Sequence, residues 1–205
     1  METSLIVAFV GFGRNVIGLI TRPYETCRRI VEKGNPLELT YVGTVLALYF
    51  ILASLVKVAS FRPFLLTRQF FVLVGAAGLT YCLVVVIFWG IGKLIGANGK
   101  LKGFAVLWGY SLLPTVIWFF VTSVLYVLLP PPRTTSIRGV IFSVLFLVFS
   151  ITLFLWKTTI GYLSLRFGLR LGLGKILLVC VLAFPLLGLY SVGMYRLGIF
   201  RIPFL

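Results

Sequence analysis

Long apolar runs, separated by short clusters of charged residues, repeat along most of the chain. Five runs without a charged residue approach or exceed the length that a helix needs to cross about 30 Å of hydrocarbon. The runs are Leu39–Val56, Gln69–Gly92, Gly103–Pro132, Gly139–Trp156 and Ile176–Tyr195. This pattern predicts five transmembrane helices, with spans near residues 37–57, 69–93, 103–129, 138–165 and 175–196.

Prolines modify two of these runs. The third run ends in Pro130–Pro132, so its helix should stop near Leu129. Pro114 lies inside the third run and Pro185 inside the fifth. Each proline frees a backbone carbonyl one turn earlier, which for Pro114 is that of Tyr110. We therefore expect a kink or a polar gap in both helices, although kinks are ordinary in membrane helices.

The first apolar stretch is too short to span a bilayer, since only 11 uncharged residues separate Glu2 from Arg14. Helical periodicity places Ser4, Gly11, Arg14, Asn15 and Gly18 on one side and Leu5, Phe9, Phe12, Val16 and Leu19 on the other. This pattern predicts an interfacial amphipathic helix. A signal peptide is the alternative, but no positive charge precedes the stretch and no small-residue cleavage site follows it.

A short basic segment separates this helix from the first span. Arg22-Pro23 should interrupt the amphipathic helix, and residues 24–33 should form a second helix supported by a Glu25–Arg29 pair. We divide the chain into an N-terminal interfacial and basic segment, residues 1–33, and a five-span membrane domain, residues 34–205.

The start of the first span carries a helix-initiation signal. Asn35 is placed to cap the helix, Pro36 to occupy its first position and Glu38 to reach back as in a capping box. We interpret Glu38 as part of this start signal and not as a catalytic carboxylate.

Composition agrees with the apolar pattern. The 205 residues are 60% hydrophobic and 11% charged, with a mean hydropathy of +1.14, which is typical of an all-α integral membrane protein. The chain has no His and no Asp, and its four carboxylates are Glu2, Glu25, Glu32 and Glu38. Catalytic triads, HExxH zinc sites and aspartate dyads are thus excluded, and the later spans hold no carboxylate for a proton relay. We predict no enzyme activity, no catalytic or metal-binding residue and no cofactor.

The three cysteines indicate no disulfide framework. Cys27, Cys82 and Cys180 are odd in number and far apart, and the last two lie in apolar runs. We interpret them as small hydrophobic residues.

The formal net charge of +15 fits anionic lipid headgroups rather than nucleic acid. With a cytoplasmic N-terminus, 12 Lys and Arg face the cytoplasm and 7 face the other side. The seven are Lys57, Arg62, Arg68, Arg133, Arg138, Arg196 and Arg201. We predict a multi-pass protein of the cell membrane with its N-terminus in the cytoplasm and its C-terminus outside.

Several short motifs follow one another along the chain. They are the segment Arg22-Pro23-Tyr24-Glu25-Thr26-Cys27-Arg28-Arg29-Ile30, the glycine-rich loop Gly96–Phe104, the Gly109-Tyr110-x-x-x-Pro114 element, the fourth span led by Trp156, and the return loop Gly172–Lys175. Together these motifs resemble the Yip family, the Ypt/Rab-interacting membrane proteins, in which an Arg-Pro-x-x-Thr-x-x-x-Ile segment precedes the first span.

The resemblance implies a bundle of five spans with a cytoplasmic N-terminus and a role in membrane trafficking or membrane organisation. It covers residues 22–195, and the order and spacing of the motifs carry it. The chain departs from the eukaryotic pattern, which has a long cytoplasmic tail with acidic residues. This departure argues against Rab GTPase binding and favours a prokaryotic member.

The predicted cytoplasmic loops, Gly90–Gly103 and Gly161–Lys175, both combine glycine with basic residues. Glycine lets a ligand approach the backbone closely, and ammonium or guanidinium groups bind phosphate. These features predict a lipid or anion site at Lys100, Lys102, Lys157, Arg166, Arg170 and Lys175. Basic flanks that merely follow the positive-inside rule are the alternative.

Lys157 differs from the other five residues because it lies inside the fourth span. A helix that continues to Leu165 places Lys157 about 12 Å from the cytoplasmic boundary. Its ammonium either faces the bundle or a wet cavity, or reaches the headgroups by snorkelling.

Two functions remain open from the sequence. The first is a non-enzymatic protein that binds membrane lipids, or a protein partner or second copy, through its basic cytoplasmic face. The second is a channel or transporter with a path lined by Thr80, Tyr81, Tyr110, Ser111 and Thr122. The first is favoured because the spans show neither carboxylates nor an inverted repeat.

Overall fold

The computed structural model describes residues 2–57, 63–128 and 137–199. The described residues form eight α-helices and one π-helical turn, η1, with no strand. The elements are α1 (Glu2–Thr21), α2 (Pro23–Lys33), α3 (Glu38–Lys57), α4 (Pro63–Leu94), α5 (Leu101–Tyr110), α6 (Leu113–Leu128), α7 (Ile137–Leu163), η1 (Ser164–Gly168) and α8 (Leu173–Arg196).

The described helices confirm an all-α membrane protein. Four helical segments are long and apolar enough to cross a bilayer, namely Thr67–Leu94, Leu101–Leu125, Gly139–Gly168 and Leu173–Arg196. A fifth candidate combines α2 with α3 as a pair bent by 118°. The shorter apolar stretch Leu5–Thr21 precedes them.

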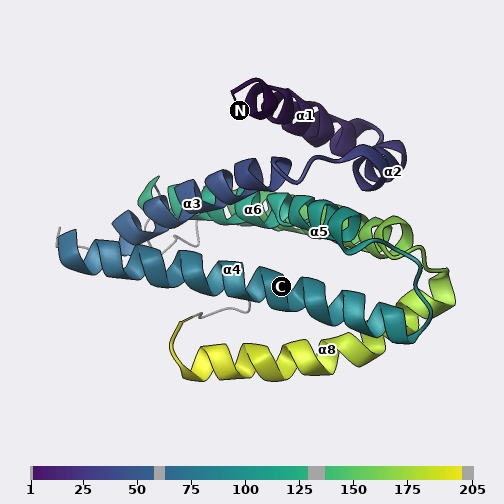
Figure 1. Ribbon diagram of the computed structural model, residues 1–205. Coiled ribbons are helices and arrows are strands. Elements are labelled where there is room, and N and C mark those ends of the chain that lie inside the picture. The colour runs from purple at the N-terminus through teal and green to yellow at the C-terminus, as the bar shows by residue number, and fades with distance from the viewer. Residues whose placement is uncertain (1, 58–62, 129–136, 200–205) are drawn as a thin grey trace.

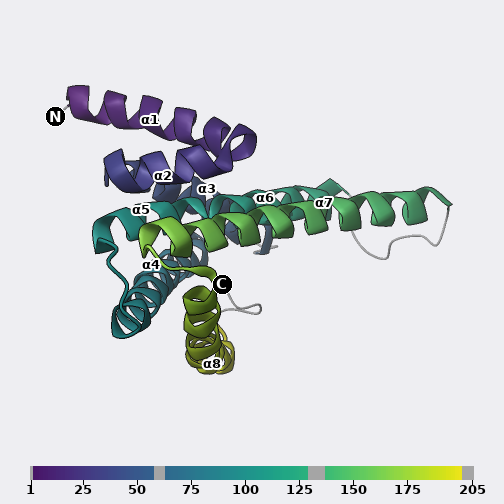
Figure 2. The ribbon, with the colours of Figure 1, turned by 90° about the vertical axis from the view of Figure 1, so that its right-hand side faces the viewer.

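The helices form layers (Figures 1 and 2). α4 and α8 lie side by side in one layer, and α3, α5, α6 and α7 form the next. The hairpin of α1 and α2 covers the outer face of this second layer, where α1 contacts α3 and α2 contacts α5. In Figure 2, α7 runs across the view, whereas α4 and α8 are seen nearly end-on. The spans therefore form a helical bundle in which α7 crosses α4 and α8 at an angle.

Proline explains the main interruption. The predicted third span is two helices, because α5 ends at Tyr110 and α6 begins at Leu113, with Pro114 in its first turn. A break just before Pro114 agrees with the carbonyl that this proline frees at Tyr110. Pro185, in contrast, lies inside a continuous α8. Residues 130–132 are outside the described residues.

The helix-initiation signal of the first span is confirmed. The amide of Leu37 donates to Asn35 Oδ1 at 3.1 Å, and the amide of Asn35 donates to Glu38 Oε1 at 3.3 Å. Pro36 lies in a tight turn before α3, so regular helix begins two residues later than this proline.

One prediction for the N-terminal segment is wrong. Arg29 pairs with Asn15 instead of Glu25, whose carboxylate lies 3.7 Å from Arg22.

Both predicted sides of α1 contribute to its packing. Asn15 of the polar side and Leu19 of the apolar side are buried, whereas Phe9 of the apolar side is 60% exposed. The apolar side therefore packs on the protein near the end of α1 and is exposed near its start.

Candidate functional site

The two predicted glycine-rich loops meet at one end of the molecule. The C-terminal end of α4, the start of α5, η1 and the start of α8 lie together there, beneath α2 (Figure 1). A Cβ atom on Gly99 would lie 1.9 Å from the backbone oxygen of Gly168. One on Gly168 would lie 2.8 Å from the Phe104 ring. Only glycine permits this close approach, which joins the two loops.

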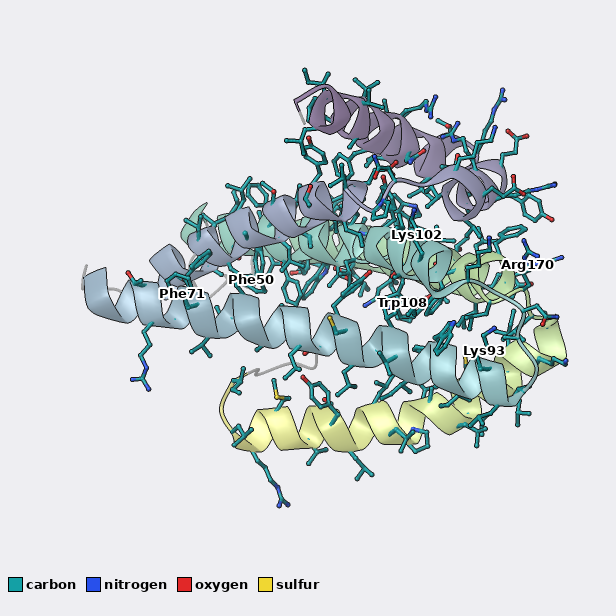
Figure 3. The ribbon with its side chains drawn as sticks, viewed as in Figure 1. Phe50, Phe71, Lys93, Lys102, Trp108 and Arg170 are labelled. Atoms are coloured by element: carbon teal, nitrogen blue, oxygen red, sulfur yellow. The ribbon has the colours of Figure 1, made fainter. Side chains whose placement is uncertain are left out.

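Exposed cations surround this contact. We define the basic end as Lys93, Lys100, Lys102, Arg166, Arg170 and Lys175, all of which are exposed. Figure 3 shows Lys93, Lys102 and Arg170 at the same end of the protein. Five of the six predicted binding residues thus lie in one region, to which the structure adds Lys93.

No carboxylate forms an ion pair with a cation of the basic end in the described part of the chain. The two ion pairs of the described residues are Arg22–Glu25 and Arg28–Glu32, both within or next to α2. Arg166 instead donates a 2.8 Å hydrogen bond to the hydroxyl of Tyr162. Lys93 lies over the Trp89 ring, 5.7 Å from its centroid. The basic end therefore presents its positive charge to the surroundings.

Arg170 has an unusual backbone conformation. Its φ of 57° is in the left-handed region, which costs a non-glycine residue about 1–2 kcal/mol. Arg170 lies in the short connection between η1 and α8, and this turn keeps its side chain at the exposed end.

A buried polar cluster, which the sequence did not reveal, connects the N-terminal hairpin to the spans. The Glu38 carboxyl accepts hydrogen bonds from Asn15 Nδ2 at 2.8 Å and from the hydroxyl of Tyr110. Arg29 Nη2 donates to Asn15 Oδ1 at 2.9 Å. These residues come from α1, α2, α3 and α5. The one feature of the sequence that pointed to this cluster was the carboxylate of Glu38 directly beside an apolar run.

The motif residues that carried the family resemblance support this hairpin. Pro23 is the first residue of α2, and Arg22 precedes it. Tyr110 is fully buried, and Trp156 Nε1 donates to the Leu19 carbonyl at 3.4 Å. A Cβ atom on Gly109 would lie 2.3 Å from Leu39 Cδ2. These residues thus hold α1 and α3 against the spans.

Lys157 is separate from the basic end. It is half-buried in α7 and lines a cavity inside the protein. Nine residues separate it from Arg166, or about 13 Å of helix rise. The six predicted residues therefore do not form one site.

The described residues contain no group of three or more His, Cys, Asp or Glu side chains that could hold a metal ion. Cys27 is buried, Cys82 is exposed and Cys180 is half-buried, all as free thiols.

The helical layers and the basic end define a polytopic α-helical membrane protein. The family model of the Yip1 domain matches residues 17–195, which is most of the chain. The protein belongs to the Yip1 domain family, as its motifs had indicated. Comparison with curated proteins and with solved structures gave no significant match.

Proposed function

We propose that this protein is a non-enzymatic Yip-type membrane protein that binds anionic lipid headgroups through the basic end. Six exposed cations belong to the α4–α5 and η1–α8 regions, which meet there. A basic residue near an anionic membrane surface contributes about 1 kcal/mol of attraction. Their joint effect would enrich anionic lipid around this end, in keeping with a role in membrane organisation or trafficking.

The gathering of exposed, carboxylate-free cations is the observation that carries this proposal. A protein partner with an acidic surface, or a second copy with acidic residues near α2, would use the same attraction. The positive-inside rule makes the basic end cytoplasmic. The N-terminus then lies in the cytoplasm and the C-terminus outside.

The hydrogen bonds of the polar residues considered for a transport path favour a binding function over transport. The Thr80 hydroxyl donates to Ala76 O, and the Tyr81 hydroxyl donates to Ala105 O. Tyr110 bonds Glu38, and the hydroxyls of Ser111 and Thr122 donate to backbone carbonyls. Because each hydroxyl donates its hydrogen within the protein, none of these side chains has a free donor to offer a solute.

Lipid selectivity in nanodiscs tests the proposal. The protein is reconstituted in phosphatidylcholine with a minor fraction of spin-labelled phosphatidylglycerol or phosphatidylcholine, and the motionally restricted fraction is measured by electron spin resonance. We expect a preference for phosphatidylglycerol that decreases between 0.15 M and 1 M salt, because the Debye length shrinks from about 8 Å to about 3 Å.

Two variants, one at the basic end and one at the opposite end, locate the effect. Replacing Lys100, Lys102, Arg166 and Arg170 by Gln should abolish the preference. The control replaces Arg68 and Arg196 by Gln, which are exposed cations near the ends of α4 and α8 away from the basic end. Equal selectivity in the wild type and the fourfold variant would contradict the proposal.

A further inference from the structure

A cavity of about 860 Å³ lies between the two layers of spans. Its walls come from five helical regions: Leu46 of α3, Thr80 and Phe88 of α4, Trp108 to Phe119 of α5 and α6, Ser150 to Tyr162 of α7, and Ile176 to Leu187 of α8. A volume of roughly 300–1,000 Å³ is typical of sites that enclose a small organic ligand. The cavity can therefore hold a ligand of that size or one acyl chain.

Lys157 is the one charged residue among those that line the cavity. In the described part of the chain, its ammonium has neither a carboxylate partner nor a hydrogen bond. Thr115 is another residue of the cavity wall, and its Oγ1 atom, which is buried within the wall, has no hydrogen-bond partner. Most other polar side chains of the wall are engaged, as in the 2.9 Å hydrogen bond from Trp118 Nε1 to Ser150 Oγ.

Helix register brings the two unengaged groups near one another. α6 and α7 run antiparallel side by side (Figure 2), and the Trp118–Ser150 hydrogen bond sets their register. Moving three residues back along α6 reaches Thr115, which is opposite residue 153 of α7. Lys157 is four residues further along, or about 6 Å of rise. A cation and a hydroxyl donor thus lie about one turn apart in the same wall.

The cavity opens sideways, toward the hydrocarbon. Phe154 of α7 and Phe184 of α8 both line it, yet they are 66% and 58% exposed. α7 packs against α6, whereas α8 packs against α4. Figure 2 shows α7 and α8 diverging from one another. A ligand could enter between them from the membrane.

We propose that this cavity binds one anionic amphiphile from the bilayer, with its acid group at Lys157 and Thr115 and an acyl chain along the apolar walls. A lone ammonium in an apolar site is costly, and an anion that pairs with it removes that cost. A threonine hydroxyl adds a hydrogen-bond donor to the same oxygen atoms. An acyl chain fills the rest of the cavity, whose lining is almost entirely hydrophobic.

Quenching of tryptophan fluorescence by brominated chains tests this site directly, since Trp108 and Trp118 line the cavity. The full chain in a mild detergent is titrated with 9,10-dibromostearate, with phosphatidylglycerol carrying the same chain, and with the matching phosphatidylcholine. We expect saturable quenching by at least one of the two anionic probes at a concentration tenfold or more below that of phosphatidylcholine. Quenching by only one anionic probe identifies the source as free fatty acid or phospholipid.

Two kinds of variant test the charge of Lys157 and the free volume of the cavity separately. Lys157→Met should raise the anionic half-saturation concentration about tenfold, to that of phosphatidylcholine, and Lys157→Arg should preserve binding. Gly161 lines the cavity and a Cβ atom there meets nothing within 4 Å, so Gly161→Leu should fill the cavity and reduce quenching. Gly193→Leu is the matched control, because its Cβ also meets nothing within 4 Å and Gly193 is outside the cavity wall.

Equal quenching by anionic and zwitterionic probes would overturn the proposal. Unchanged binding in Lys157→Met or in Gly161→Leu would do the same. The fourfold variant of the basic end should bind the brominated anion as well as the wild type does. The experiments therefore test the proposed cavity site independently of the proposed lipid binding at the basic end.

Discussion

Asn15 of α1 donates a buried 2.8 Å hydrogen bond to Glu38, the first residue of α3, although 23 residues separate them in the chain. Glu38 also accepts the Tyr110 hydroxyl, so a single carboxyl group joins α1, α3 and α5. Gly11 makes room for it, since a Cβ atom there would lie 3.1 Å from Glu38 Oε1. The N-terminal hairpin is therefore part of the folded domain.

Glu38→Ala should destabilise the protein substantially. Removing the carboxyl leaves the Tyr110 hydroxyl without its acceptor and the Asn15 amide with only its 3.3 Å bond to that hydroxyl. A buried group that loses its partner costs about 1–3 kcal/mol. The free energy of unfolding, measured by titration with a denaturing detergent, should fall accordingly. Glu32→Ala, which removes only an exposed ion pair, should change it by less than about 1 kcal/mol. Equal effects of the two substitutions would contradict a structural role for the cluster.

Gly18→Leu should loosen α1 from α2. A Cβ atom on Gly18 would lie 2.5 Å from Thr26 Oγ1, whereas one on Gly13 meets nothing within 4 Å. We therefore expect faster amide hydrogen exchange along α1 in Gly18→Leu, while Gly13→Leu exchanges as the wild type does. Unchanged exchange in Gly18→Leu would show that the two helices tolerate a wider separation.

Gly99→Ala should disrupt the contact between the two glycine-rich loops. The added methyl group overlaps the Gly168 carbonyl oxygen, and backbone must shift to admit it. Overpacking of this kind typically costs about 1–3 kcal/mol, which should appear as a lower midpoint of thermal unfolding. Gly90→Ala is the control, because its Cβ meets nothing within 4 Å. A Gly99→Ala variant as stable as the control would refute the close approach.

Cysteine labelling should reveal the orientation in the membrane. In a variant without its three native cysteines, Asn98→Cys should react with an impermeant maleimide only from the cytoplasm. Thr134→Cys, between the third and fourth spans, should react only from outside. The reason is the 12 to 7 asymmetry of Lys and Arg. Labelling from the opposite sides would reverse the proposed topology.

Much of the secondary structure could be predicted because its causes are local. Hydropathy over about 20 residues defines a span, and proline interrupts a helix wherever it occurs. The α5–α6 break before Pro114 and the cap at Asn35 are of this kind. Five of the predicted site residues also lie in one region for a simple reason, since alternate connections of a helical membrane protein emerge at the same end.

The partners of individual side chains could not be predicted in this way. Periodicity separates two faces of α1 but does not say which face packs on the protein. Residues of both faces are buried, because Gly11 and Gly18 allow a close approach, Asn15 has an acceptor in Glu38, and Leu19 of the other face packs into the core. Similarly, the position of Lys157 in a span is a property of the sequence, but whether it snorkels or lines a cavity depends on how α7 is placed against α6, α4 and α8. Apolarity along the chain determined that this protein crosses a membrane, whereas contacts between distant residues, which depend on packing in three dimensions, decided where its polar groups meet.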